Sequence, residues 1–444
     1  MPSLFSFVEF LAKDGEGIML INFTFRNYRS FLGEACLSFT ATEKRGQSER
    51  LLVLDRRRLL GAAGIFGPNG AGKSNVLRAA AFMCRCVLES AESGLPAPET
   101  FGGPRVQGTT GEAAAALDFV EFKPAADETS LFEMEFIDRT SPKLEIYKYG
   151  FVLGAEGVEE EWLTCRARYG EREKELFRRW DNQLVCAAAL VSRRYRDLAA
   201  FQEAARQKLG HNCLLLSLGP ALGEGPLSRS YAWFLGWDFV DLRRAEGLAE
   251  LEAQSLEELR AGEKSLGGAA AFLRKFDQSV AAIGWGEEQA LEPLIWHRFG
   301  AGGRLFGVPW REESAGLRLL LALYPCLRFA LERGGRLAIS GLGGQLHPKS
   351  LGRLLRCFGD GRKNTNGGQL LFTSHDFWQL DNDALRQDQV WLVDKSEEDG
   401  GTAGSELYSL IDFVEASRGN YYLRKKGSYG RWYMDGDFGA VPKE

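Results

Sequence analysis

The stretch Gly67-Pro68-Asn69-Gly70-Ala71-Gly72-Lys73-Ser74 organises the rest of the chain. It follows the pattern G-x-x-x-x-G-K-[ST], in which glycines let several backbone N–H groups converge on a phosphate at a helix N-terminus. The preceding residues 59–66 are apolar enough for a buried strand, and residues 75–86 are rich in Ala, Leu and Arg, which favours a helix. The stretch therefore predicts a strand, a phosphate-binding loop and a helix in direct succession.

The loop residues have expected roles in binding a nucleotide. Lys73 is predicted to reach the β- and γ-phosphates, and the Ser74 hydroxyl is predicted to ligate Mg²⁺. The full set of predicted nucleotide contacts in this stretch is Gly67, Pro68, Asn69, Gly70, Ala71, Gly72, Lys73, Ser74 and Asn75.

The composition indicates an ordinary folded protein. The 444 residues are 45% hydrophobic and 26% charged, which argues against disorder, and the net charge of −5 gives no overall attraction to DNA or membranes. The eight cysteines lack metal-ligand spacing and are interpreted as free thiols of a reducing cytoplasm. With no continuous apolar run of eighteen residues, no membrane span is predicted.

The pattern along the chain predicts an α/β fold with a mainly parallel core sheet, a flanking antiparallel β region and an inserted helical arm. Residues 1–18 are a candidate N-terminal extension, because Met19 directly precedes a strand pattern. The other predicted parts are 19–186 with the loop and the antiparallel strands, a helical arm over 187–290, and the returning core over 291–444. Predicted helices cover 190–209, 231–242, 248–259, 269–283, 311–331 and 351–358, and predicted strands include 117–122, 131–137, 146–153, 336–340, 369–374 and 389–394.

Five stretches together resemble one family, the ABC-type P-loop ATPases of the SMC-like and OLD-like branch, and in particular the small AAA-domain ATPases of bacterial abortive-infection and phage-defence systems. The stretches are Phe25-Arg26-Asn27-Tyr28-Arg29-Ser30-Phe31, the phosphate loop (Walker A), Glu313-Ser314-Ala315-Gly316, Leu346-His347-Pro348 and Thr373-Ser374-His375-Asp376. The resemblance implies an ATPase head that uses ATP and Mg²⁺.

The resemblance also implies a role for two of the later stretches. Ser314 and Gly316 would form the signature motif that contacts the γ-phosphate on a second subunit, so that ATP joins a homodimer. His375 would be the switch histidine that contacts the γ-phosphate.

The chain departs from the family at the Walker B strand. Where that strand normally ends in an Asp and a Glu, this sequence has Ser340 and Gly341, and Gly343 replaces a further Asp. No Asp or Glu occurs between Gly334 and Cys357. Because phosphoryl transfer depends on charge neutralisation and a positioned water, this degenerate Walker B predicts slow or absent hydrolysis. Asp376 is the candidate for a substitute metal-binding or water-orienting carboxylate.

These observations favour an ATP-binding, ATP-dimerised sensor or scaffold in an anti-phage system. Because too little chain follows His375 for the nuclease domain of OLD-type relatives, the expected partner is a separately encoded effector, a nuclease or toxin. The alternative is an active SMC-like ATPase that acts on DNA, and RNA is a further candidate partner. Intact Lys73 and Ser74 argue against a chain without any nucleotide role.

Overall fold

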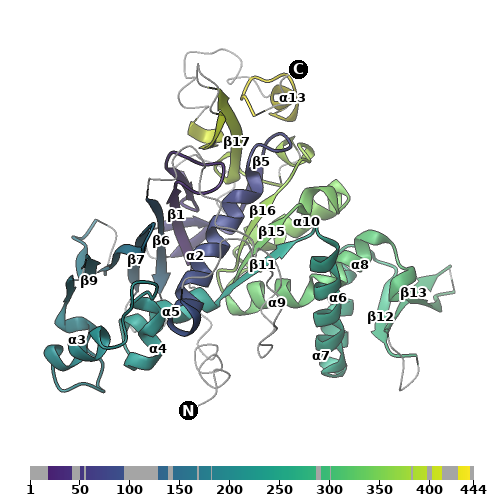
Figure 1. Ribbon diagram of the computed structural model, residues 1–444. Coiled ribbons are helices and arrows are strands. Elements are labelled where there is room, and N and C mark those ends of the chain that lie inside the picture. Colours follow the sequence, from purple (N-terminus) through teal and green to yellow (C-terminus); the bar gives the residue numbers. More distant parts are fainter. Residues whose placement is uncertain are drawn as a thin grey trace.

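A six-stranded sheet carries the phosphate loop at the carboxyl end of one of its inner strands. Its order is β11 (Trp237–Asp241), β15 (Arg336–Ser340), β16 (Gln369–Thr373), β5 (Ala62–Phe66), β17 (Val390–Glu397) and β18 (Ala403–Ser409). The first five strands run parallel and β18 is antiparallel to β17 (Figure 1). Since the carboxyl ends of parallel strands meet at one edge, the chain leaving β11, β15, β16 and β5 converges on a single site.

This computed structural model describes residues 19–42, 51–54, 57–94, 129–138, 144–167, 170–181, 183–286, 292–300, 302–381, 384–397, 403–412 and 429–440. The candidate extension over 1–18 and the strand predicted over 117–122 lie outside the described residues.

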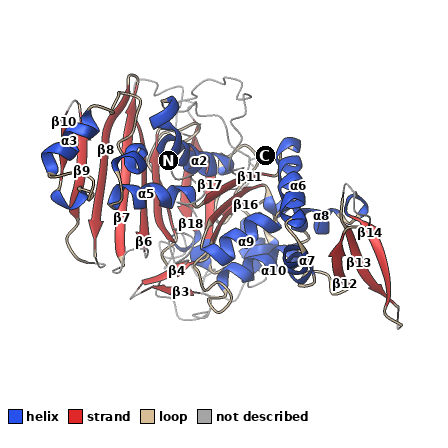
Figure 2. Cartoon of the chain, turned by 90° about the horizontal axis from the view of Figure 1, so that it is seen from below, coloured by secondary structure: helices blue, strands red, loops and turns tan. Residues whose placement is uncertain are grey.

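A second, antiparallel sheet of seven strands flanks the first. Its order is β10 (Gln183–Cys186), β9 (Lys174–Trp180), β8 (Gly157–Arg166), β7 (Glu145–Gly154), β6 (Ser130–Asp138), β1 (Met19–Arg26) and β2 (Ala35–Ser38), with the small hairpin of β3 (Leu51–Leu54) and β4 (Arg57–Leu60) nearby (Figure 2). Side chains alternate along β6, where Phe132 and Met134 face the core and Glu133 between them faces outward.

Helix α2 (Lys73–Ser93) lies between the two sheets, where it contacts β15 and β16 of the first and, through Phe82, β6 of the second. Its Phe82 is buried and packs on Tyr28 and Phe132 of the antiparallel part, at ring-centroid distances of 5.7 and 5.2 Å. Burying one aromatic side chain of this kind stabilises the fold by about 1.5–3 kcal/mol. The helix that follows the phosphate loop is thereby packed against the core on two sides.

One buried glutamine also joins the sheets. Gln369, at the start of β16, accepts a hydrogen bond from the Leu20 amide at 2.6 Å and donates to the Leu20 carbonyl at 2.9 Å. It also donates to the Leu60 carbonyl at 3.3 Å. Because a buried amide left without partners would cost about 1–3 kcal/mol, these bonds fix the position of β1 against β16.

The remaining described helices surround the two sheets. They are α3 (Leu198–Arg206), α4 (Gly219–Leu222), α5 (Pro226–Leu235), α6 (Ala245–Arg260), α7 (Glu263–Leu273), α8 (Ala315–Ala322), α9 (Tyr324–Arg333), α10 (Pro348–Gly359), α11 (Trp378–Asp381) and α13 (Tyr429–Met434), with single 3₁₀ turns at Ala188–Leu190, Leu216–Leu218, Trp310–Glu312, Leu342–Gly344 and Gln387–Gln389. Among the described residues, no helix is long and apolar enough to cross a membrane.

The segment 187–290 differs from the helical arm that we predicted. The helix expected over 231–242 ends at Leu235, and Gly236 leads into β11, which pairs with β15 as the edge strand of the core sheet. Trp237 and Val240 are buried in that position, so tertiary pairing overrides the apparent helical spacing. The segment is therefore divided by a core strand.

Three other predicted helices also differ in extent. The helix expected over 311–331 is two helices, because Ser314 caps α8 and Pro325, which lacks a backbone N–H, lies in the first turn of α9. The helix expected over 190–209 is only α3, which begins after its cap Asp197. The one expected over 269–283 ends with α7, and Val280–Gly284 forms β12.

A small three-stranded sheet projects beyond α6, α7 and α8 (Figures 1 and 2). It consists of β12, β13 (Leu294–Phe299) and β14 (Arg304–Pro309), all antiparallel. Its tip exposes three large apolar side chains, Phe299, Leu305 and Phe306. The chain passes from this sheet directly into the candidate signature motif.

Candidate nucleotide-binding site

The phosphate loop adopts the backbone conformation that its glycines permit. Gly67, Gly70 and Gly72 have φ angles of 145°, 76° and 111°, a region that residues with a Cβ avoid. A Cβ on Gly67 would lie 2.2 Å from the Val393 carbonyl oxygen, whereas a Cβ on Gly70 would meet open space. Gly67 is thus required by packing against β17, and Gly70 leaves room for a ligand at the loop.

The opening segment of the chain supports the loop from one side. A Cβ on Gly72 would lie 2.7 Å from the Ser30 hydroxyl and 2.5 Å from that of Ser405. The Asn75 side-chain amide donates a hydrogen bond to the Ser30 hydroxyl at 2.9 Å, and the Ser405 hydroxyl donates one to the same Ser30 oxygen at 2.8 Å. Arg29 beside it has a φ of 55°, which marks a tight turn. The conformation of this turn places Ser30 against the loop.

Lys73 is buried and points back along the loop. Its ammonium donates to the carbonyl oxygens of Gly67 and Pro68 at 2.8 and 2.7 Å. Burial lowers the pKa of Lys73 to about 8, and the nearby positive charge of Arg243 adds to the effect. A phosphate bound at the loop would stabilise this ammonium, because its negative charge offsets both the burial and the repulsion by Arg243.

Ser74 makes its described hydrogen bond with the core sheet. Its hydroxyl oxygen lies 3.0 Å from that of Ser340, which is fully buried at the end of β15. Strand β15 therefore delivers a neutral hydroxyl, not a carboxylate, to the predicted Mg²⁺ ligand.

Two glycines after Ser340 are held in place by their neighbours. Gly341 has a φ of 83°, and a Cβ there would lie 2.8 Å from Cγ of Arg243. A Cβ on Gly343 would lie only 1.7 Å from the Ser374 hydroxyl. In this packing neither position has room for an Asp or Glu.

His375 and Asp376 follow β16 at the same edge of the sheet. The pKa of His375 is lowered by burial and by the charges of Lys73 and Arg243, while a hydrogen bond with the Gly67 backbone acts in the opposite direction. These interactions place the imidazole beside the loop. The Asp376 carboxylate instead accepts from the Trp378 amide at 3.1 Å and from Gln379 at 2.9 Å, so it caps its own short helix.

The structure adds a carboxylate that the sequence patterns did not reveal. Asp241 ends β11 directly opposite Ser340 in the parallel register and is 1% exposed. Arg243 binds it with two hydrogen bonds of 2.8 and 2.6 Å, and Arg78 of α2 lies 3.8 Å away. Burial alone raises the pKa of Asp241, but its bonds and charge interactions with Arg243 outweigh that and hold the pKa below its usual range. The available signal was the short run Trp237-Asp238-Phe239-Val240-Asp241 after a glycine, whose aromatic and β-branched residues are typical of a strand.

The candidate signature residues lie elsewhere. Ser314 is exposed and caps α8, where its hydroxyl accepts from the Leu317 amide at 3.4 Å, and a Cβ on Gly316 would meet open space. Both ribbon views place α8 away from α2, beyond the core sheet (Figures 1 and 2). Within one chain, the signature residues and the phosphate loop are therefore separate surfaces.

The residue before the signature serine is tied to the projecting sheet. His297 of β13 lies 2.6 Å from the Glu313 carboxylate through Nε2 and 2.7 Å from the Ser279 hydroxyl through Nδ1. The other oxygen of Glu313 accepts from the Ser314 amide at 3.2 Å. The sheet of β12, β13 and β14 thus orients the start of α8.

The residues at the loop fit a nucleoside triphosphate but offer few ligands for Mg²⁺. For the phosphates there are the glycine cradle, Lys73 and the helix N-terminus of α2. For Mg²⁺ the described donors are the hydroxyls of Ser74 and Ser340, since Asp241 is bound to Arg243. Among the described residues no group of three acidic, His or Cys side chains is arranged to hold a metal ion. Any Mg²⁺ here would depend mainly on phosphate and water oxygens.

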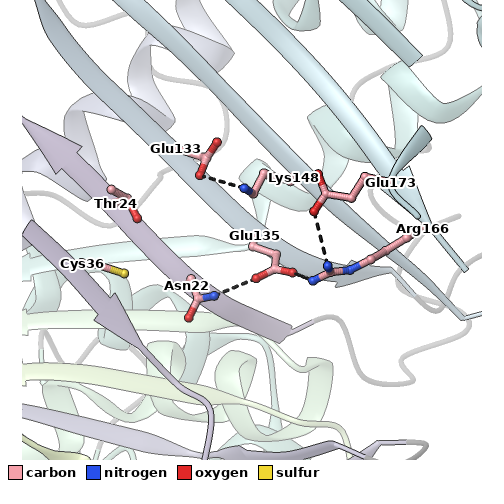
Figure 3. A pocket seen from close by; sticks show the side chains of 8 residues that line it. All are labelled: Asn22, Thr24, Cys36, Glu133, Glu135, Lys148, Arg166 and Glu173. Atoms are coloured by element: carbon pink, nitrogen blue, oxygen red, sulfur yellow. Dashed lines mark hydrogen bonds and ion pairs between the residues drawn. The ribbon is translucent and has the colours of Figure 1, made fainter. Parts of the chain in front are cut away.

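A polar hollow of about 320 Å³ lies on the outer face of the antiparallel sheet and does not include the loop. Each of its charged side chains has a partner within it, since Lys148 pairs with Glu133 and Arg166 pairs with Glu135 and Glu173 (Figure 3). The hollow is therefore a satisfied ion-pair network on the side of the sheet opposite α2.

Comparison with known proteins supports the same part of the chain as the nucleotide-binding unit. Residues 62–185 match the family described as AAA domain, putative AbiEii toxin, Type IV TA system. This region contains β5, the loop and α2 and is similar to an ATP-binding AAA domain. No curated protein matches the chain. A solved structure described as "Crystal structure of the SmcHead bound to the C-winged helix domain of ScpA" is similar at a TM-score of 0.39 and 11% identity, over 89% of this chain and 99% of that one.

Proposed function

We propose that this chain, which resembles the AAA-type ATPases of abortive-infection systems, is an ATP-binding subunit that dimerises on ATP and hydrolyses it slowly or not at all. In this proposal it serves as the sensor or scaffold of an anti-phage system and acts through a separately encoded effector. The observation that carries it is the contact between Ser74 and Ser340, which leaves the predicted metal ligand without a carboxylate.

The binding part of the proposal rests on the loop. Three glycines in the left-handed region, the buried Lys73 and the free N-terminus of α2 form a cradle for phosphate groups. These groups act through charge and hydrogen bonds to the phosphates, so they remain effective without a catalytic carboxylate.

The slow-hydrolysis part rests on the edge of the sheet. An attacking water needs a group that accepts its proton or orients it, and that group commonly contributes a factor of about 10²–10⁴ to the rate. At the carboxyl ends of β15 and β16 the structure has Ser340, Gly341 and His375, and Asp376 is engaged by its own helix. We therefore expect bound ATP to remain intact for a time in which an ordinary ATPase would complete many turnovers.

The dimer part rests on the exposed signature residues. Ser314 and Gly316 stand at an accessible helix N-terminus that favours anions, and they lie away from the loop of their own chain. A second copy can therefore supply its triphosphate to this surface, and each of two bound ATP molecules would be shared between the copies.

The test is light scattering of purified protein with and without ATP, together with chromatography of the bound nucleotide after several hours. We expect a doubled mass and intact ATP for the natural sequence, and neither for Lys73→Ala. An unchanged mass for the natural sequence with ATP would refute dimerisation. Steady ADP production stimulated by DNA in a salt-sensitive manner would support the alternative, an active ATPase that works on DNA.

A further inference from the structure

We propose that Arg243 is a ligand for the terminal phosphate of a nucleoside triphosphate, and that it occupies the space in which the missing carboxylate would stand. This inference rests on the proposed nucleotide binding and extends it. It assigns a residue from β11 to the site and predicts which nucleotide the site prefers.

The position of Arg243 follows from the pairing of β11 with β15. The Asp241 and Ser340 residues are opposite each other, and the Leu242 amide donates to the Ser340 carbonyl at 3.0 Å. This continued pairing carries Arg243 across the end of β15, where its Cγ fills the place of a side chain on Gly341. Arg243 therefore lies beside Gly341, the residue that follows Ser340, and Ser340 is the serine that contacts Ser74.

The guanidinium of Arg243 is held in a fixed orientation. Asp241 accepts from Nε and from Nη2, and its carboxylate is also bound to the Arg243 backbone amide at 3.2 Å. An arginine offers five N–H donors, so this pair leaves the Nη1 group available. Since 42% of the Arg243 side chain is exposed, a ligand at the loop can reach it. Because the guanidinium is already held in one orientation, binding a phosphate costs less conformational entropy.

The charges around the loop point to an anionic ligand with several negative charges. Burial lowers the pKa of Lys73 and of His375, and the positive charge of Arg243 lowers both further. Burial also lowers the pKa of Arg78, and the charges of Arg29 and Arg243 add to that effect. Asp241 forms ion pairs with two of the cations, Arg78 and Arg243, and so offsets only part of this positive charge. A triphosphate would neutralise this excess, and a diphosphate would do so less completely.

Two consequences follow for recognition. Because Arg243 supplies positive charge near the third phosphate, ATP should bind more tightly than ADP, and binding should depend little on Mg²⁺. Because the same side chain fills the place of a carboxylate at 341, the bound ATP would face a cation where a water-activating base is needed.

The experiment compares the affinities for fluorescent ATP and ADP analogues, each with Mg²⁺ and with EDTA. Arg243→Gln removes the charge, and the matched control Arg244→Gln removes the charge of the next residue, which is exposed and pairs with Glu246 at 3.7 Å. For Arg243→Gln we expect the affinity for ATP to fall about tenfold to hundredfold, the size of one charge-assisted hydrogen bond, with little change for ADP. Arg244→Gln should match the natural sequence.

The outcomes separate this inference from the proposed function. Equal losses for ATP and ADP, or no loss, in a folded Arg243→Gln protein would overturn the role of Arg243. Failure of the natural sequence to bind ATP any better than Lys73→Ala would overturn the proposed function itself. If Arg243→Gln melts at a lower temperature, Arg243→Lys keeps the charge without the fork, and it should retain part of the preference for ATP; a loss of preference equal to that of glutamine would contradict the role of the charge.

Discussion

The hydroxyl oxygens of Ser74 and Ser340 lie 3.0 Å apart, although the two residues are separated by most of the chain. Ser74 is the last residue of the phosphate loop, in the first turn of α2, and Ser340 ends the buried strand β15. In the proposed function Ser340 stands where a metal-binding carboxylate would be needed, and a single substitution can place a carboxylate there.

Ser340→Asp is expected to make ATP binding dependent on Mg²⁺. The new carboxylate would face Ser74 and could bind the cation, whose presence would offset the cost of a buried charge. Without Mg²⁺ the variant should lose about 1–3 kcal/mol of unfolding free energy. Titration calorimetry with Mg²⁺ and with EDTA measures the first effect and thermal melting the second.

Ser340→Ala serves as its control. It removes one hydrogen bond, worth about 1 kcal/mol, and adds no charge. If Ser340→Asp and Ser340→Ala respond equally to Mg²⁺, the position does not face the metal.

Gly343→Ala is expected to destabilise the fold by about 1–3 kcal/mol, the usual cost of overpacking a core. The added Cβ would collide with the Ser374 side chain, whose residue is held in place by the hydrogen bond that its backbone amide donates to the Ile65 carbonyl of β5 at 3.0 Å. Gly344→Ala is the matched control, since a Cβ there meets nothing within 4 Å. Denaturant unfolding of both variants should show a loss for Gly343→Ala alone, and equal stabilities would mean that Ser374 moves aside.

The affinity for ATP is expected to fall as pH rises above about 8. The folded pKa of Lys73 is about 8, below its ordinary 10.5, so the ammonium that binds phosphate is lost in this range. Bound phosphate should raise that pKa again, and ATP binding near pH 8.5 should therefore take up a proton. Calorimetry in two buffers of different ionisation enthalpy measures this uptake.

The same residue predicts a change in stability with pH in the absence of nucleotide. Between pH 8 and 10.5 the folded protein holds fewer protons on Lys73 than the unfolded chain, so the unfolding free energy should rise with pH across this window. Lys73→Ala should lack this rise. A rise of the same size in the variant would assign the effect to other groups.

Ser314→Asp is expected to keep the fold and abolish association on ATP. Aspartate caps a helix as well as serine does, so α8 should retain its stability within about 0.5 kcal/mol. Its negative charge would repel the triphosphate of a second copy. Light scattering should show a monomer that still binds ATP, and a dimer of normal affinity would exclude Ser314 from the interface.

Much of the core could be predicted from local sequence. The loop, the strands that became β5, β15, β16 and β17, and the helix α10 all appear near their predicted positions, because buried strands and amphipathic helices have distinct spacings of apolar residues. The position of β11 could not be predicted in this way. Its short segment fits a helix or a strand, and only pairing with β15 selects the strand.

The sequence by itself determined that this chain has a phosphate-binding loop, because the glycines, Lys73 and Ser74 act within one short segment whose backbone conformation is local. It also determined that no carboxylate follows Ile339 on β15. Only the tertiary structure decided what replaces that carboxylate. Asp241 and Arg243 come to the end of β15 through the parallel register of two strands far apart in the chain, and such pairing depends on the packing of the whole sheet, not on any local pattern.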